Sequence, residues 1–346
     1  MRRVLGHQLF WPLLTLLLLL ALNAAVNPGF LQLQWREGHL YGSLIDILNR
    51  AAPLVLVSIG MTMVIATRGI DISVGATVAI TAAVAALMVG GELVVRDGVP
   101  TMSSRFPMPL ALMAALAVAL LCGLWNGLLV AGVGMQPIIA TLVLMVAGRG
   151  IAQLISGGQI ITVYYPPYFF LGNGHLLGLP FSVFVAAAVA LALHLALTRT
   201  ALGLFVQAIG INPAAARMAG VRQKAITVGV YAFCGLCAGL AGLLISSNVK
   251  SADGNNAGLL MELDAILAVT LGGTLLTGGR FSLAGSVIGA LVIQTLTSTI
   301  YSIGVPPEVN LVVKAAVVFV VMLLQSAEFR GMLRGWAFRP VAGSAR

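Results

Sequence analysis

The chain alternates between long apolar runs and short polar or glycine-rich breaks along its whole length. A run of about 20 apolar residues is long enough to cross the hydrocarbon core of a bilayer as a helix. The pattern predicts about ten such helices, over residues 9–26, 44–67, 72–90, 109–132, 137–156, 179–198, 226–247, 263–277, 283–303 and 309–325. Because lipid excludes open sheets and no alternating strand pattern recurs, we expect an all-α, polytopic membrane helical bundle.

Two of the predicted helices are short or border on a break. The segment "ATRGIDISVG" separates the second helix from the third, and residues 263–277 contain Gly272 and Gly273. Interrupted helices in the two halves of a transporter often lie near the substrate route or at a moving joint, and a tight turn explains them equally well. Glycine pairs four residues apart, such as Gly123 with Gly127, favour close helix packing.

Composition and charge agree with a membrane chain. Hydrophobic residues make up 60% of the sequence and charged residues only 8%, which excludes a soluble enzyme and leaves nucleic-acid binding little support. The net charge of +9 reflects basic residues in loops on one side, so both termini are predicted to be cytoplasmic. We expect a cytoplasmic N-terminus at residues 1–8, a membrane domain at residues 9–325 and a basic tail at residues 326–346.

The cysteine and histidine residues do not indicate a disulfide, a metal site or a catalytic site. Cys122, Cys234 and Cys237 all fall within apolar runs, where we expect them to pack rather than form disulfides, and the four histidines show no metal-ligand spacing. We therefore expect no metal, no cofactor in this chain and no catalytic histidine.

The largest predicted cytoplasmic loop, residues 199–225, contains the basic segment "GINPAAARMAGVRQKA". Asn212 is a good N-cap, Pro213 suits the first helical position, and Gly220 suits the left-handed residue after a helix. The segment thus encodes a helix of about two turns, too short to persist alone in water. It rests either on a partner protein or, through its basic residues, on lipid headgroups.

Polar side chains within the apolar runs are candidates for a passage, because burying them in hydrocarbon is costly unless they face a cavity or one another. They are Asn126, Gln136, Arg149, Gln153, Gln294, Asn310 and Lys314. Hydrogen bonding between helices explains each of them as well, and Lys314 needs a partner or water. Asp71 and Ser73 suit helix capping or solute contact. The absence of a cluster of like charges favours a neutral, polyhydroxylated solute.

Three motifs in order, "GMTMVIATRGIDISVG", "GINPAAARMAGV" and "ELDAILAVTLGGTLLTGGRFSLAGSVIGA", resemble the permease subunits of ribose-type sugar ABC importers of the type II class. The resemblance runs from about residue 45 to residue 325. Within that family, "YGSLIDILNRAAP", "MVAGRGIAQLI", "SADGNNAGL" and "PPEVNLVVKA" are most similar to the permeases of galactofuranose importers, which pair with a second, non-identical permease. Arg68 departs from the small residue usual before "GID".

The resemblance implies that residues 212–221 form a coupling helix that docks on a cytoplasmic ATPase. Its candidate residues are Asn212, Pro213, Ala215, Ala216, Arg217, Ala219 and Gly220. ATP would bind the partner, since no lysine of this chain stands in a G-x-x-x-x-G-K-[ST] motif. The implied passage residues are Asp71, Ser73, Asn126, Gln136, Gln294 and Asn310. A periplasmic sugar-binding protein would dock near Asp253, Asn255, Asn256 and Glu262.

Two other classes of protein share some of these features. An ion-coupled secondary transporter has a similar composition but usually places an acidic residue deep in a helix, whereas the acidic residues here fall mostly at predicted helix ends or in loops. An intramembrane enzyme requires a nucleophile or acid–base set converging at one depth, which the sequence does not offer. We therefore expect a multi-pass protein of the bacterial inner membrane that transports sugar and is not itself an enzyme.

Overall fold

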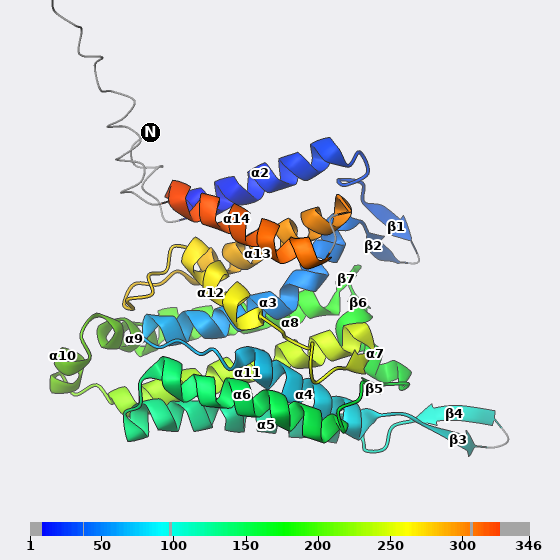
Figure 1. The fold of residues 1–346 in the computed structure, drawn as a ribbon, viewed down its shortest axis with the longest axis horizontal. Helices are drawn as coiled ribbons and strands as arrows, with labels where there is room; N and C mark the ends of the chain where they lie inside the picture. Colours follow the sequence, from blue (N-terminus) through cyan, green and yellow to red (C-terminus); the bar gives the residue numbers. More distant parts are fainter. Residues whose placement is uncertain (1–8, 37, 97–98, 305–306, 326–346) are drawn as a thin grey trace, which may run out of the picture.

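The computed structural model describes residues 9–36, 38–96, 99–304 and 307–325 as a bundle of helices (Figure 1). The helices are α2 (Phe10–Val26), α3 (Ser43–Ala66), α4 (Val74–Val89), α5 (Met108–Gly127), α6 (Pro137–Ser156), α7 (Pro166–Asn173), α8 (Phe181–Arg199), α9 (Leu202–Ile211), α10 (Pro213–Met218), α11 (Gln223–Val249), α12 (Met261–Leu271), α13 (Leu283–Ser302) and α14 (Pro307–Gln325). A π-helical turn, η1 (Leu128–Val133), extends α5. Each of the ten predicted apolar runs contains a helix, although residues 272–277 of the run 263–277 are not helical.

Six of the helices in the described part of the chain are long and apolar enough to cross a membrane, and α2 and α4 are shorter apolar helices. The main difference from the sequence prediction is α12, which ends at Leu271 instead of residue 277. Gly272 and Gly273 follow it, and Gly273 has a left-handed φ of 86°, which stops the helix. The predicted N-terminal segment and basic tail lie outside the described residues.

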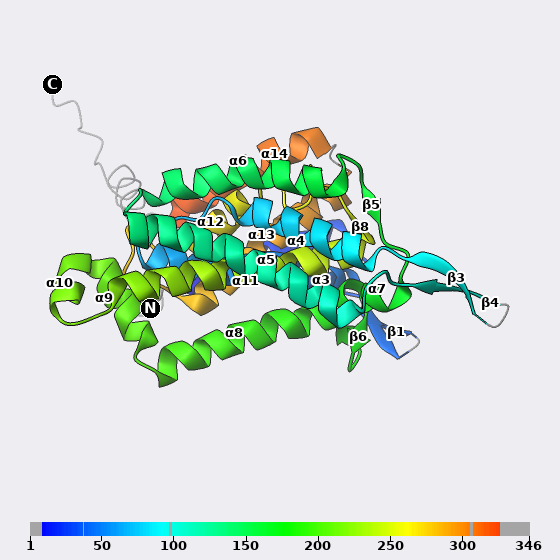
Figure 2. The ribbon, with the colours of Figure 1, turned by 90° about the horizontal axis from the view of Figure 1, so that it is seen from below.

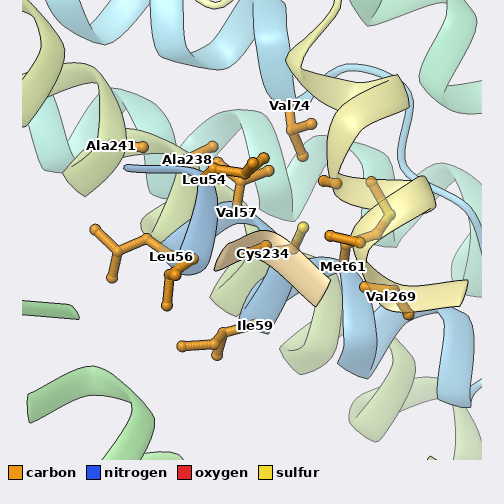
Figure 3. Packing of buried hydrophobic residues seen from close by; sticks show 14 of the residues in the cluster. Leu54, Leu56, Val57, Ile59, Met61, Val74, Cys234, Ala238, Ala241 and Val269 are labelled. Carbon is orange, nitrogen blue, oxygen red and sulfur yellow. The ribbon is translucent and has the colours of Figure 1, made fainter. Parts of the chain in front are cut away.

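The core of the bundle is built around α3 and α11. Leu56, Val57 and Ile59 of α3 are fully buried and belong to one apolar cluster with Cys234 and Ala238 of α11 (Figure 3). Every residue of α3 from Ala51 to Ala66 is buried, so this helix lies inside the protein rather than against lipid. Cys234 and Cys237 are buried and unbonded, as packing residues should be.

Small residues let α5 approach α11 closely, as the glycine spacing predicts. A Cβ atom added to Gly123 would lie 2.4 Å from the carbonyl oxygen of Tyr231, which no real side chain tolerates. Lipid tails are as apolar as leucine, so close backbone packing, rather than the hydrophobic effect, holds such helices together within a bilayer.

The two ends of the bundle differ, and the sequence did not predict this. The short strands gather at one end, where they form the pairs β1 (Gln34–Arg36) with β2 (His39–Tyr41), β3 (Glu92–Arg96) with β4 (Val99–Ser103), β5 (Ile161–Thr162) with β8 (Ser251–Ala252), and β6 (His175–Leu176) with β7 (Leu179–Pro180) (Figures 1 and 2). We call this the hairpin end. The helices α9 and α10 lie at the opposite end, the α10 end (Figure 2). All the pairs are antiparallel.

Candidate functional site

The short helix α10 forms where its sequence predicts it. The Oδ1 atom of Asn212 accepts hydrogen bonds from the backbone N–H groups of Ala214 and Ala215, both at 3.1 Å. Pro213 occupies the first turn, and Gly220 follows the helix with a left-handed φ of 84°. Capping at one end and a glycine at the other therefore fix a helix too short to form alone.

Helix α10 presents most of its surface to the outside. Ala216 is buried at 5% exposure, whereas Ala215, Arg217 and Ala219 are exposed. Met218 is 84% exposed, which places it among the most exposed large apolar side chains of the described residues. Met218 was not among the residues predicted from the sequence, although an apolar residue in a polar loop helix was a usable signal.

Helix α9, which supports α10, is anchored to the break between α3 and α4. A Cβ atom added to Gly210 would lie 2.0 Å from the carbonyl oxygen of Ala66, so the last turn of α9 presses directly on the end of α3. The Arg68 guanidinium donates hydrogen bonds to the carbonyl oxygens of Gly210 and Ile211, at 2.6 and 2.7 Å. Arg68 therefore joins α9 to the rest of the bundle.

The same place receives the glycine loop between α12 and α13. The backbone N–H of Gly279 donates to the carbonyl oxygen of Ala66 at 2.9 Å. The break between α3 and α4 thus meets the loop after α12 at the α10 end, where Arg68 of the break and Gly279 of the loop both contact the last turn of α9.

Three of the predicted passage residues form one closed network. The Asp71 Oδ1 atom accepts hydrogen bonds from the backbone N–H of Ser73 at 3.0 Å, from its hydroxyl at 2.7 Å, and from the Asn126 Nδ2 at 3.3 Å. The Nδ2 atom also donates to the Ser73 hydroxyl at 2.7 Å. All three residues are at most 1% exposed, so in this conformation they join the start of α4 to the end of α5.

Asp71 caps less of α4 than the sequence suggested. It accepts the N–H of Ser73, the residue before the helix, and no side-chain cap reaches the first turn of α4. The Oδ1 atom of Asn126 is buried without a partner among the described residues. A small movement of α4 away from α5 would therefore free several polar groups together.

The other predicted passage residues come from separate elements. Gln136 is the exposed N-cap of α6, and Gln294 is half-buried in α13. Asn310 lies in α14, and its side chain is outside the described part of the structure. The structure does not bring these three into contact with the Asp71 network through any hydrogen bond among the described residues.

Lys314 and Arg149, which the sequence marked as buried cations, both find partners. The Lys314 Nζ atom of α14 lies 2.5 Å from the Asp264 Oδ2 atom of α12. Arg149 of α6 donates to the carbonyl oxygens of Ala257 and Asn255 at 2.6 and 3.3 Å. Gln153 donates to the Asn255 Oδ1 at 2.6 Å, so α6 holds the loop before α12 in place.

The predicted docking residues divide into two groups. Asn255 and Asn256 are exposed in the loop between α11 and α12, where they donate to the partly exposed Asp253 carboxylate. Desolvation raises the pKa of Asp253, but the hydrogen bonds from Asn256 and Asn255 together lower it below the ordinary value. Glu262 is only 4% exposed in this conformation, and its carboxylate lies against Gly75 of α4, so its role as a docking contact stays a prediction.

Comparison with known proteins gives one family and several close relatives. A family model described as the permease component of branched-chain amino acid transport systems matches residues 43–322. A galactofuranose transporter permease of Escherichia coli is 48% identical over 94% of this chain and 93% of its own length. No solved structure matches the chain.

Two further relatives are more distant. A fructose import permease of Bifidobacterium longum is 36% identical over 96% of this chain and 91% of its own length. A ribose import permease of Escherichia coli is 35% identical over 91% of this chain and 92% of its own length.

Proposed function

Because this chain belongs to the family of permease components of branched-chain amino acid transport systems, we propose that it is the membrane-spanning permease of an ATP-driven sugar importer. Three relatives whose names specify sugar transport support this proposal. Galactofuranose is the proposed sugar, because the relative named for it is 48% identical and those named for fructose and ribose are 36% and 35% identical. The protein is not itself an enzyme in this proposal.

The proposed assembly contains an ATPase, a periplasmic sugar-binding protein and a second permease that is a relative rather than a copy of this chain. It lies in the inner membrane of a bacterium, with the α10 end and both termini in the cytoplasm. The unbalanced basic charge near α10 supports this orientation: among the described residues no acidic side chain pairs with Arg199, Arg217 or Arg222.

The ATPase docks on α10, and the observation that carries this step is the exposure of Met218 beside Arg217. A capped helix with an exposed apolar side chain and a cation suits a protein groove better than a linker bathed in water. Asn212, Pro213 and Gly220 shape the helix, Ala215, Arg217 and Ala219 contact the ATPase, and Ala216 fixes the helix to the bundle.

Movement of α10 reaches the membrane through α9. Since Arg68 ties the end of α9 to the break between α3 and α4, a push on α10 acts on the segment that carries Asp71. In this proposal Asp71, Ser73 and Asn126 contact the sugar once α4 and α5 separate. Gln136, Gln294 and Asn310 contribute further hydrogen-bonding groups along the passage, and Asp253, Asn255 and Asn256 contact the binding protein.

The test is co-purification and uptake with one charged substitution on α10. Met218→Asp places a carboxylate in the proposed ATPase groove, so the ATPase should no longer co-purify, and uptake of labelled galactose by the reconstituted importer should fall to background. Lys224→Asp is the matched control, because Lys224 is also exposed, at the start of α11, but lies outside α10. Retention of the ATPase and of uptake by Met218→Asp would refute the docking.

A further inference from the structure

A groove of about 840 Å³ opens at the α10 end of the bundle, on the side of α8. Its walls come from α3, α8, α9, α11 and the segment that joins α10 to α11. Figure 2 shows that α8 lies apart from the other helices at this end. The lining includes Met63, Ala196, Phe205, Gly229 and Phe233.

The groove is apolar and unfilled by the protein. A Cβ atom added to Gly229 would meet no atom within 4 Å, so no described side chain occupies the space above that position. An apolar hollow offers water no hydrogen-bond partners, and within a bilayer hydrocarbon is the available filling. The shape and lining of the groove therefore suit acyl chains.

One cationic side chain, that of Arg222, lines the groove. Arg222 is the charged residue of the lining; it is exposed, and no acidic side chain in the described part of the chain pairs with it. Arg222 directly precedes α11, at the α10 end, which the proposed orientation places at the cytoplasmic surface of the membrane. An arginine at this level attracts negatively charged lipid, and its planar guanidinium suits bidentate hydrogen bonding to a phosphate.

We propose that this groove binds one anionic phospholipid, with its phosphate at Arg222 and its acyl chains along Gly229 between α8 and α11. The binding itself does not depend on the proposed transport function. The groove also reaches the end of α10, because its lining includes Ala219, Gly220 and Val221. The lipid thus contacts the connection between α10 and the membrane-spanning bundle.

The experiment is native mass spectrometry of the delipidated full-length chain, titrated with dioleoyl phosphatidylglycerol or dioleoyl phosphatidylcholine. These lipids share acyl chains and differ in headgroup charge. We expect one phosphatidylglycerol to be retained at about a tenfold lower concentration than phosphatidylcholine. Soluble glycerol phosphate should not be retained, which separates a lipid site from a site for free phosphate.

Four variants distinguish headgroup from chain contacts. Arg222→Gln should reduce the tenfold preference to less than threefold and leave phosphatidylcholine retention unchanged. Lys224→Gln removes a neighbouring cation outside the lining and should keep the full preference. Gly229→Leu and Ala196→Leu fill the groove from opposite walls and should each abolish retention of both lipids. Two filling variants on different helices keep the test decisive if one fails to fold.

Several outcomes would overturn the proposal. Equal retention of the two lipids by the unmodified chain would show that the groove has no site for an anionic headgroup. An equal loss of the preference for phosphatidylglycerol in Arg222→Gln and Lys224→Gln would show that Arg222 does not form such a site. Undiminished retention by both filling variants would place the lipid elsewhere. If the isolated chain retains phosphatidylglycerol but the assembled importer excludes it, the groove belongs to a protein partner.

Discussion

Lys314 of α14 and Asp264 of α12 form an ion pair with 2.5 Å between the Nζ and Oδ2 atoms. Their side chains are only 12% and 26% exposed, so both charges are largely removed from water. The pair joins two helices that otherwise both pack against α13. It also supplies the partner that the sequence analysis required for Lys314.

Breaking this pair from one side should destabilise the protein. Lys314→Met leaves the Asp264 carboxylate partly buried and unpaired; the loss is expected to be about 2 kcal/mol, less than for a fully buried pair because Asp264 retains some contact with water. The double variant Lys314→Met with Asp264→Leu should recover most of the loss. Thermal unfolding in detergent measures both, and a double variant as unstable as the single one would contradict this account.

The cap of α10 can be tested separately from its contacts. Asn212→Ala removes the acceptor of two backbone N–H groups and should cost the helix about 1 kcal/mol, which appears as faster hydrogen exchange at residues 214–219. Asn212→Asp retains the acceptor and should leave exchange unchanged. Equal exchange in all three proteins would show that packing on α9, rather than the cap, holds α10 in place.

Arg68 provides a test of mechanical coupling. Arg68→Met removes both hydrogen bonds to the end of α9, so ATP hydrolysis by the reconstituted importer should continue while uptake per ATP falls several-fold. Arg68→Lys should give an intermediate result, since one ammonium group does not reproduce the two-pronged contact. Unchanged uptake per ATP in Arg68→Met would exclude this link from the coupling route.

The long helices could be predicted because each depends on its own apolar run, and the cap at Asn212 because it depends on neighbouring residues. The shorter helices α7 and α9 fall between the predicted runs and were missed. The strand pairs were missed because most are two or three residues long and leave almost no alternation in the sequence. The burial of Glu262 was missed for a different reason. Glu262 follows a polar loop, and only the folded chain brings that loop back against Gly75.

The polar network illustrates the same limit within the candidate passage. The sequence identified Asp71, Ser73 and Asn126 individually from their types and surroundings. It did not show that they bind one another, because Asn126 lies on a different helix and at a distance in sequence that no local pattern spans. The contact of Arg68 with α9 could not be predicted either, because Gly210 and Ile211 are also distant from it in sequence.

A pair of histidines should make the hairpin end sensitive to pH. His39 of β2 and His175 of β6 stack with 4.4 Å between ring centroids, and the N–H of Leu40 donates to the carbonyl oxygen of Gly178 beside them at 2.9 Å. Desolvation, and then the charge of His39, lower the pKa of His175 below its ordinary value of 6.5. The fold thus favours neutral His175.

The pKa of His175 is lower in the folded protein than in the unfolded chain, so protonation of His175 destabilises the fold. The full stability of the hairpin contact is therefore present above pH 6.5 and is lost as the pH falls from there through the folded pKa. Hydrogen exchange at residues 174–179, corrected for the intrinsic effect of pH, should therefore be faster at pH 5.5 than at pH 7.5. His175→Asn cannot take up the proton, so its corrected exchange should not change between the two conditions. If the unmodified protein shows no acceleration, or if His175→Asn shows the same one, titration of His175 does not control the contact between the two hairpins.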